Sequence, residues 1–107
     1  GFYMLNWYSK LFVGEGARKN LSRTILKIKA GRLAAGIYVI TLSANPDNLL
    51  EFFRADLLKQ KAFRLNCPPI IGIAKGKDEA MDLVAQILQE TYACAGTFCV
   101  EEYLKNR

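Results

Sequence analysis

The sequence predicts an α/β fold in which two N-terminal helical segments precede β-α-β-α-β, with a mainly parallel three-stranded sheet covered by helices. Two near-continuous runs of β-branched and aromatic residues, 37–42 and 70–74, are typical of strands buried on both faces of a parallel sheet. Helical segments between and after them favour right-handed βαβ units. We expect one domain, with an aromatic segment (1–16), a basic amphipathic helix (17–31) and a βαβαβ core (37–107).

The first 31 residues predict two helices separated by a glycine-rich break at 14–16. In residues 2–12, apolar side chains, Trp7 among them, recur at helical spacing. From residue 17 onward, apolar side chains again recur every three or four positions and basic side chains lie between them, which predicts an amphipathic helix. Residues 25–29 also alternate as a strand would, so a strand there is an open alternative.

The second half of the sequence predicts two helices and a final strand. Asn45 is a favourable N-cap and Pro46 suits the first helical position, so we expect a helix over 47–61. Residues 78–93 show the clearest amphipathic helical pattern in the chain. Residues 98–104 alternate weakly, as an edge strand would.

The composition argues against an enzyme. Histidine is absent, which removes the commonest general base and metal ligand. We therefore expect no catalytic residue, no metal and no cofactor. The odd set of cysteines, Cys67, Cys94 and Cys99, has no metal-binding spacing and favours free thiols in a reducing cytoplasm. No apolar run reaches the roughly 18 residues of a membrane span, so we expect a cytoplasmic protein that does not cross a membrane.

The positive charge is concentrated near the N-terminus. Residues 1–36 carry seven Lys or Arg and one Glu, a net charge of +6, whereas residues 37–107 carry eight Lys or Arg and nine Asp or Glu, a net charge of −1. A local positive field attracts phosphates, which makes nucleic-acid binding one hypothesis; the alternative is an ordinary solvated helix face. The residues expected to contact nucleic acid are Arg18, Lys19, Arg23 and Lys27.

Two loops are expected to meet at the carboxyl ends of the parallel strands, where such sheets bind their ligands. Each loop leads into a helix whose first N–H groups can bind an anion, so a site for an anionic small molecule or nucleotide is a second hypothesis. The alternative is that the loops carry these residue types for folding alone. The candidate ligand-binding residues are Asn45, Asp47, Asn48, Lys75, Gly76 and Lys77.

Several stretches carry a resemblance to known proteins: residues 7–8 with 10–15, residues 38–42 with 45 and 48–51, and residues 72–76 with 79–80. On these stretches the chain resembles an uncharacterised family of small bacterial α/β proteins. The resemblance implies a bacterial, cytoplasmic protein, and it implies no activity or ligand.

The expected function is a non-enzymatic binding or interaction module. The aromatic surplus of residues 1–16, beside a sheet of only three strands, favours self-association through this apolar segment, so a homo-oligomer is expected. Nucleic-acid binding and binding of an anionic small molecule are the alternatives.

Overall fold

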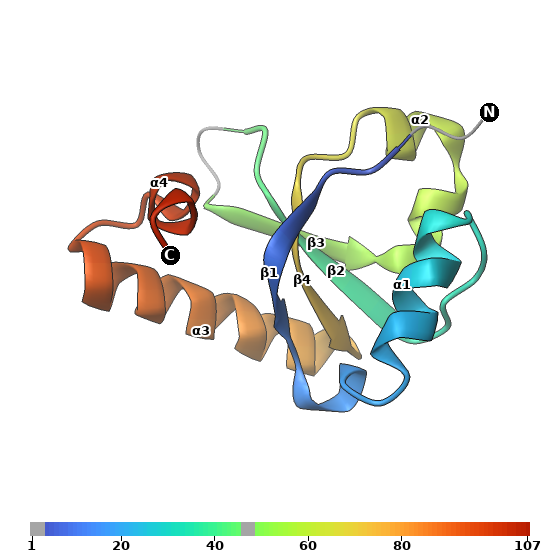
Figure 1. The fold of residues 1–107 in the computed structure, drawn as a ribbon, viewed down its shortest axis with the longest axis horizontal. Coiled ribbons are helices and arrows are strands. Elements are labelled where there is room, and N and C mark those ends of the chain that lie inside the picture. Colours follow the sequence, from blue (N-terminus) through green and yellow to red (C-terminus); the bar gives the residue numbers. More distant parts are fainter. Residues whose placement is uncertain (1–3, 46–48) are drawn as a thin grey trace.

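Four strands form one mixed sheet in the order β1-β4-β2-β3 within residues 4–45 and 49–107, the part of the chain that the computed structural model describes (Figure 1). The strands are β1 (Trp7–Val13), β2 (Ile37–Leu42), β3 (Leu50–Arg54) and β4 (Ile70–Lys75). The α-helices are α1 (Leu21–Lys29), α2 (Lys61–Leu65), α3 (Lys77–Ala95) and α4 (Val100–Lys105), and two short 3-10 helices are η1 (Glu15–Ala17) and η2 (Ala55–Lys59). The protein is therefore a small α/β domain.

The two central strands, β2 and β4, confirm the strands predicted at 37–42 and 70–74. Their predicted direction is wrong, because β4 is parallel to β1 and antiparallel to β2. The chain leaves β2 and pairs antiparallel with it as β3 before it crosses over, so the connection through η2 and α2 joins β3 to β4. A mixed four-stranded sheet thus replaces the expected three-stranded, mainly parallel one.

The helix predicted over 47–61 is also wrong, because this segment contains β3, η2 and the start of α2. Along β3 the side chains alternate between the two faces of the sheet: Phe53 packs in one hydrophobic cluster, and Leu50 and Phe52 pack in the other. The apolar residues of this stretch also fit a helical spacing, which explains the error. The predicted start of the helix, at residues 46–48, lies outside the described residues.

The N-terminal aromatic segment forms β1 and not the predicted helix. Trp7 and Leu11 pack on one face of the sheet, while Tyr8 and Phe12 pack on the other. Because β1 carries apolar side chains on both faces, its sequence has no simple alternation, and its apolar residues also match a helical period. Residues 2 and 3, which belong to the same prediction, lie outside the described residues.

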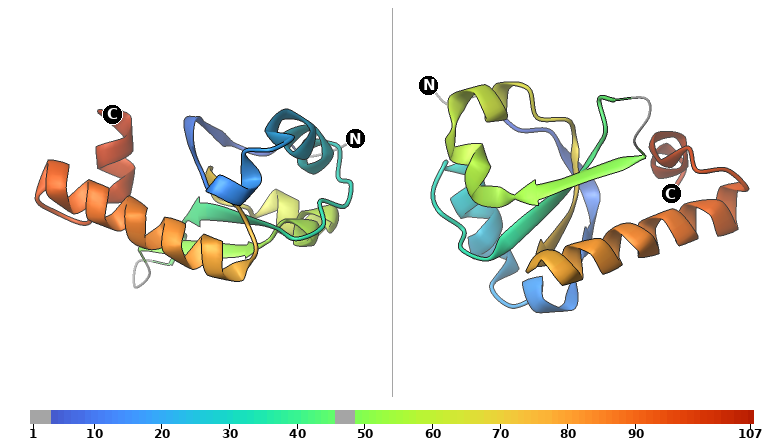
Figure 2. Two further views of the ribbon diagram at one scale, coloured as in Figure 1. Left: turned by 90° about the horizontal axis from the view of Figure 1, so that it is seen from below. Right: turned by 180° about the vertical axis from the view of Figure 1, so that it is seen from behind.

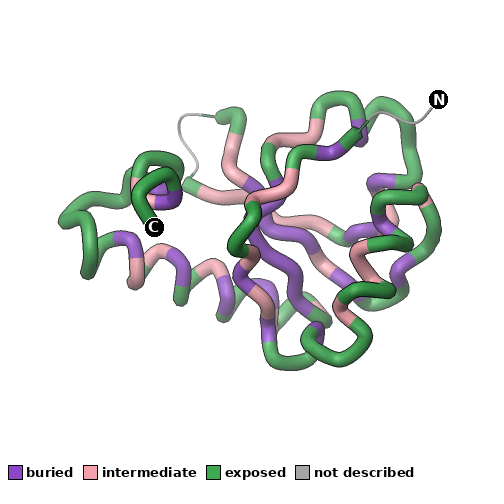
Figure 3. The backbone as a smooth tube through the Cα atoms, viewed as in Figure 1, coloured by how far each residue is buried: buried purple, intermediate pink, exposed green. Residues whose placement is uncertain are grey.

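Two hydrophobic clusters fill the two faces of the sheet, which are covered from opposite sides by α1 and by α3 with α4 (Figure 2). On the α1 face, Ile28 of the helix shares a cluster with Val39 and Ile73. On the other face, Ile87 of α3 shares a cluster with Ile40. The central strands are consequently the most deeply buried part of the chain (Figure 3).

The helix predicted at 78–93 is confirmed by α3, and α1 lies inside the predicted helix at 17–31, which excludes the strand alternative there. The edge strand predicted at 98–104 is wrong, because α4 occupies it. Val100 and Leu104 are one helical turn apart and both are buried in the cluster that α3 also joins, so one side of α4 packs on the core. None of the helices in the described part of the chain is long and apolar enough to span a membrane.

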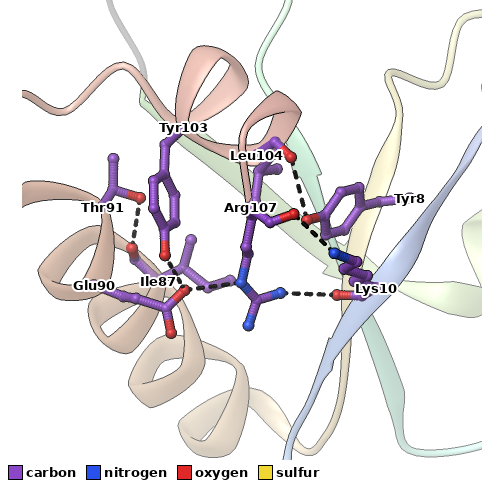
Figure 4. A network of polar contacts seen from close by, with 8 residues as sticks. All are labelled: Tyr8, Lys10, Ile87, Glu90, Thr91, Tyr103, Leu104 and Arg107. Atoms are coloured by element: carbon purple, nitrogen blue, oxygen red, sulfur yellow. Dashed lines mark hydrogen bonds and ion pairs between the residues drawn. The ribbon is translucent and has the colours of Figure 1, made fainter. Parts of the chain in front are cut away.

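The end of α4 is attached to β1 by polar contacts (Figure 4). The hydroxyl of Tyr8 donates to the Leu104 carbonyl oxygen at 3.3 Å. Lys10 Nζ donates to the Arg107 carbonyl oxygen at 2.8 Å, and Arg107 Nη1 donates to the Lys10 carbonyl oxygen at 3.1 Å. The guanidinium of Arg107 also lies 4.1 Å from the centre of the Phe12 ring. These contacts hold α4 against the sheet.

Candidate functional site

Four cationic side chains from two distant segments line one groove of about 240 Å³. Lys19 precedes α1, Arg23 and Lys27 lie on α1, and Lys75 ends β4. We call this site the basic groove. Its remaining lining residues are uncharged: Gly16, Asn20, Thr24, Ala34, Ala35 and Ile37.

The helical repeat places the cations of α1 on one side. Arg23 and Lys27 are four residues apart and lie on one stripe of α1, Lys19 lies two residues before the helix, and all three are exposed. The opposite side of α1 packs on the sheet through the buried Ile28 and the partly buried Ile25. The amphipathic pattern that buries α1 therefore also presents its cations to solvent.

Glu79, in the first turn of α3, fixes Lys75 beside α1. Its carboxylate accepts a hydrogen bond from the Gly16 N–H at 2.6 Å and another from the Lys75 N–H at 2.5 Å. It thereby links η1 to the end of β4. A Cβ atom at Gly14 would overlap the Glu79 side chain, so the glycine leaves room for the carboxylate. The carboxylate also keeps a negative charge beside Gly16 and Lys75, two lining residues of the groove, and this charge offsets part of the positive charge there.

Three of the four residues predicted to bind nucleic acid line the basic groove: Lys19, Arg23 and Lys27. The fourth, Arg18, is exposed and pairs with Glu15 at 3.3 Å. Binding of nucleic acid by these residues stays a prediction.

The strand directions place residues predicted to bind an anionic ligand at opposite ends of the sheet. Because β2 and β4 are antiparallel, Asn45 follows one end of the sheet and Lys75 the other, and the common rim expected for a parallel pair does not form. Gly76 has a φ of +84° and donates its N–H to the Gly36 carbonyl oxygen at 2.8 Å, so it serves the turn into α3. Lys77 begins α3 outside the basic groove. Asp47 and Asn48 lie outside the described residues.

The sequence alone could not predict that Lys75 lines the same groove as α1. The two segments are separated by about half the chain, and the sequence pattern carried no information on the direction of β4 relative to β2. The spacing of Lys19, Arg23 and Lys27 was the available signal, and it identified one wall of the groove only.

A second concavity lies beside β3, and the sequence did not predict it. It has a volume of about 740 Å³ and is mostly apolar. We call it the apolar hollow. Its lining residues are Ala44, Leu50, Glu51, Phe52, Phe53, Ala62, Phe63, Asn66, Cys67 and Pro68.

Cys67 is the chemically distinctive group of the apolar hollow. Burial raises the pKa of its thiol to about 11, and the nearby positive charge of Arg64 opposes this only in part. The thiol is therefore protonated at neutral pH, and the protonated form is a poor nucleophile. Because the folded-state pKa exceeds the ordinary value of 9.0, the stability linked to this proton is present below pH 9 and is lost as the pH rises toward 11.

Comparison of the chain with protein-family models, with curated proteins and with solved structures finds no match. The resemblance seen in the sequence therefore stays a prediction. Within residues 4–45 and 49–107, no three cysteine, aspartate or glutamate side chains are placed to hold a metal ion.

Proposed function

We propose that the protein binds a phosphate-bearing anionic ligand in the basic groove. The observation that carries this proposal is the convergence of Lys19, Arg23, Lys27 and Lys75 on one concavity, which no acidic side chain lines among the described residues. Like charges that share a concave surface raise the local positive potential and attract anions. Lys and Arg are also the side chains that bind phosphate through charge-assisted hydrogen bonds.

The size of the groove favours a compact anion. A concavity of about 240 Å³ is smaller than the roughly 300–1,000 Å³ that is typical of pockets for drug-sized ligands. It suits a phosphate or diphosphate group whose attached organic part lies outside. A nucleic-acid backbone, in contrast, needs cations spread along a longer track. Asn20 and Thr24, which line the same groove, add polar groups for phosphate oxygens.

Reversing two charges of the groove tests the proposal. The variant Arg23→Glu with Lys27→Glu is expected to bind inorganic pyrophosphate about 100-fold more weakly, because two attractive contacts become repulsive. The measurement is titration calorimetry at about 50 mM salt, where electrostatic binding is strong. The matched control is Lys59→Glu with Lys105→Glu, which changes the net charge equally at exposed positions outside the groove.

Retained affinity in the control together with loss in the groove variant supports the proposal. Equal loss in both variants would mean that net charge, and not the groove, binds the anion. A single-stranded oligonucleotide in the same titration distinguishes the nucleic-acid alternative. If it binds far more tightly than pyrophosphate and its affinity falls steeply with salt, the ligand is nucleic acid.

Self-association is a second proposal, supported by the apolar hollow and not by the N-terminal segment. Phe12 is buried in the core, so the aromatic segment offers less apolar surface than expected. The apolar hollow instead opens beside β3, which is at the edge of the sheet. Exposed apolar side chains near it are Leu49, Phe63 and Leu65. An edge strand beside an apolar surface favours pairing with a second copy of the chain.

The variant Phe63→Asp is expected to convert a dimer into a monomer, because it places a charge in the proposed interface. Light scattering coupled to gel filtration at micromolar concentration measures the mass. Met81→Asp is the matched control, since Met81 is a comparably exposed apolar residue on α3 and does not line the hollow. A wild-type monomer across the concentration range rejects the proposal.

A further inference from the structure

Two cysteines flank the connection between α3 and α4. Cys94 lies in the last turn of α3, and Cys99 is the N-cap residue of α4. Both are exposed free thiols, and both line one hollow of about 430 Å³ together with Tyr103 and Glu102. No other function described above uses either of them.

The backbone between the two cysteines turns back on itself. Gly96 ends α3 in the left-handed conformation, with φ +73°, and donates its N–H to the Tyr92 carbonyl oxygen at 2.9 Å. The returning chain brings the Phe98 ring onto the Tyr92 ring, with 4.9 Å between the ring centres. The residue after Phe98 is therefore held close to the last turns of α3.

Contacts one helical turn away fix how the two helices meet (Figure 4). The Tyr103 hydroxyl donates to Glu90 Oε2 at 2.8 Å. This hydrogen bond is the main cause that raises the pKa of Tyr103 to about 12, and Cys94 adds to the rise through its own contact with Tyr103. Cys94 follows Glu90 by one turn on α3, and Cys99 precedes Tyr103 by one turn on α4. Both cysteines thus lie one helical turn from the Glu90–Tyr103 contact, on the side of the connection between the helices.

We propose that Cys94 and Cys99 form a redox-responsive dithiol, which a small-molecule disulfide such as oxidised glutathione converts into an intramolecular disulfide. In the first step one thiolate attacks the glutathione disulfide, forms a mixed disulfide and releases one reduced glutathione. In the second step the other thiolate attacks the protein sulfur of the mixed disulfide and releases the second reduced glutathione. The protein loses two hydrogen atoms, and one molecule of oxidised glutathione becomes two of reduced glutathione.

The disulfide would fasten the start of α4 to the end of α3. Arg107 already attaches the other end of α4 to Glu90 at 3.1 Å, so oxidation would hold this helix at both ends. Local opening of α4 should then become rarer, because the covalent link restricts the opened state.

Oxidation of the Cys67→Ser variant tests the dithiol without interference from the third thiol. After treatment with oxidised glutathione at about pH 8, where thiol–disulfide exchange proceeds, the intact mass is expected to fall by two hydrogen atoms with no glutathione attached. Trypsin cleaves after Lys77 and Lys105, so both cysteines lie in one peptide, and its mass locates the disulfide. Closure is expected to be favoured over two mixed disulfides by about tenfold or more, because its second step is intramolecular.

Matched variants and a structural measurement complete the test. Cys94→Ser and Cys99→Ser, each combined with Cys67→Ser, are expected to take up a single glutathione and to form no internal link. Hydrogen exchange of α4 amides should slow in the oxidised dithiol protein and recover after reduction with dithiothreitol. Accumulation of two glutathiones on the dithiol protein, or a disulfide that joins two chains, would overturn the proposal.

Discussion

Replacement of Arg64 by methionine is expected to lower the free energy of unfolding by about 3 kcal/mol. Arg64 is only 4% exposed. Its Nη1 donates to the Ile28 carbonyl oxygen at 2.8 Å and to the Leu58 carbonyl oxygen at 3.2 Å, and its Nη2 donates to the Lys29 carbonyl oxygen at 2.9 Å. Methionine keeps much of the aliphatic volume and leaves three carbonyl oxygens without these donors.

The carbonyl groups that Arg64 contacts explain why a buried cation is tolerated. Ile28 and Lys29 are the last residues of α1, where carbonyl oxygens without a full intrahelical partner and the negative end of the helix dipole favour a positive charge; the Ile28 oxygen also accepts from the Gly31 N–H at 3.1 Å. A helix of nine residues is marginal by itself in water, so this cap stabilises α1 through tertiary contact. Urea unfolding followed by circular dichroism measures the loss.

The variant Arg32→Met is the matched control for Arg64→Met, because Arg32 is exposed and its replacement is expected to change stability by less than about 0.5 kcal/mol. Arg64→Lys should fall between wild type and Arg64→Met, since lysine keeps the charge and lacks the planar fork. If Arg64→Met unfolds at the same urea concentration as Arg32→Met, the proposed stabilisation of α1 is wrong.

Replacement of Gly72 by alanine is expected to lower the free energy of unfolding by about 2 kcal/mol, because a Cβ atom would overpack the middle of the sheet. Such an atom would lie 3.2 Å from the Phe12 carbonyl oxygen of β1 and 3.3 Å from Ile40 Cδ1 of β2. Ile40 is the antiparallel partner of Gly72, so this crowding depends on the observed register of β2 and β4.

A double-mutant cycle separates this crowding from the general effect of the substitution. Ile40→Val removes Cδ1 and by itself should cost about 1 kcal/mol. In the Gly72→Ala background it should cost almost nothing, because the removed methyl is the one that crowds the new side chain. Ile73→Val is the control, since Ile73 belongs to the cluster on the opposite face. Additive losses for Gly72→Ala with Ile40→Val would contradict the register.

Local sequence patterns predicted the elements that do not depend on distant partners. β2 and β4 are each buried on both faces, so their composition alone indicates a strand, and α3 has an amphipathic repeat long enough to exclude a strand. The predictions for β1, β3 and α4 failed because the apolar residues of these segments fit both a helical and a strand period. Tertiary packing, and not local propensity, decides such segments.

The same limit applies to the basic groove. The cations of α1 were identified from their spacing, but Lys75 was assigned to the wrong partner, Asn45, because the sequence does not encode strand direction locally. β3 runs antiparallel to β2, and so does β4. Lys75 therefore lies at the opposite end of the sheet from Asn45. The wrong prediction for the segment that forms β3 therefore also misplaced Lys75, which lies more than twenty positions further along the chain.

The placement of β1 has a consequence for the order in which the domain can assemble. Among the described strands β1 pairs only with β4, and the partner of Trp7 is Ile70, 63 residues further along the chain. β2 and β3, in contrast, are neighbours in sequence and can meet after closing a short loop. Because long loops cost more entropy to close, pairing of β1 is the slow, non-local event. During synthesis, β1 has no strand to pair with until the ribosome has made more than half of the domain.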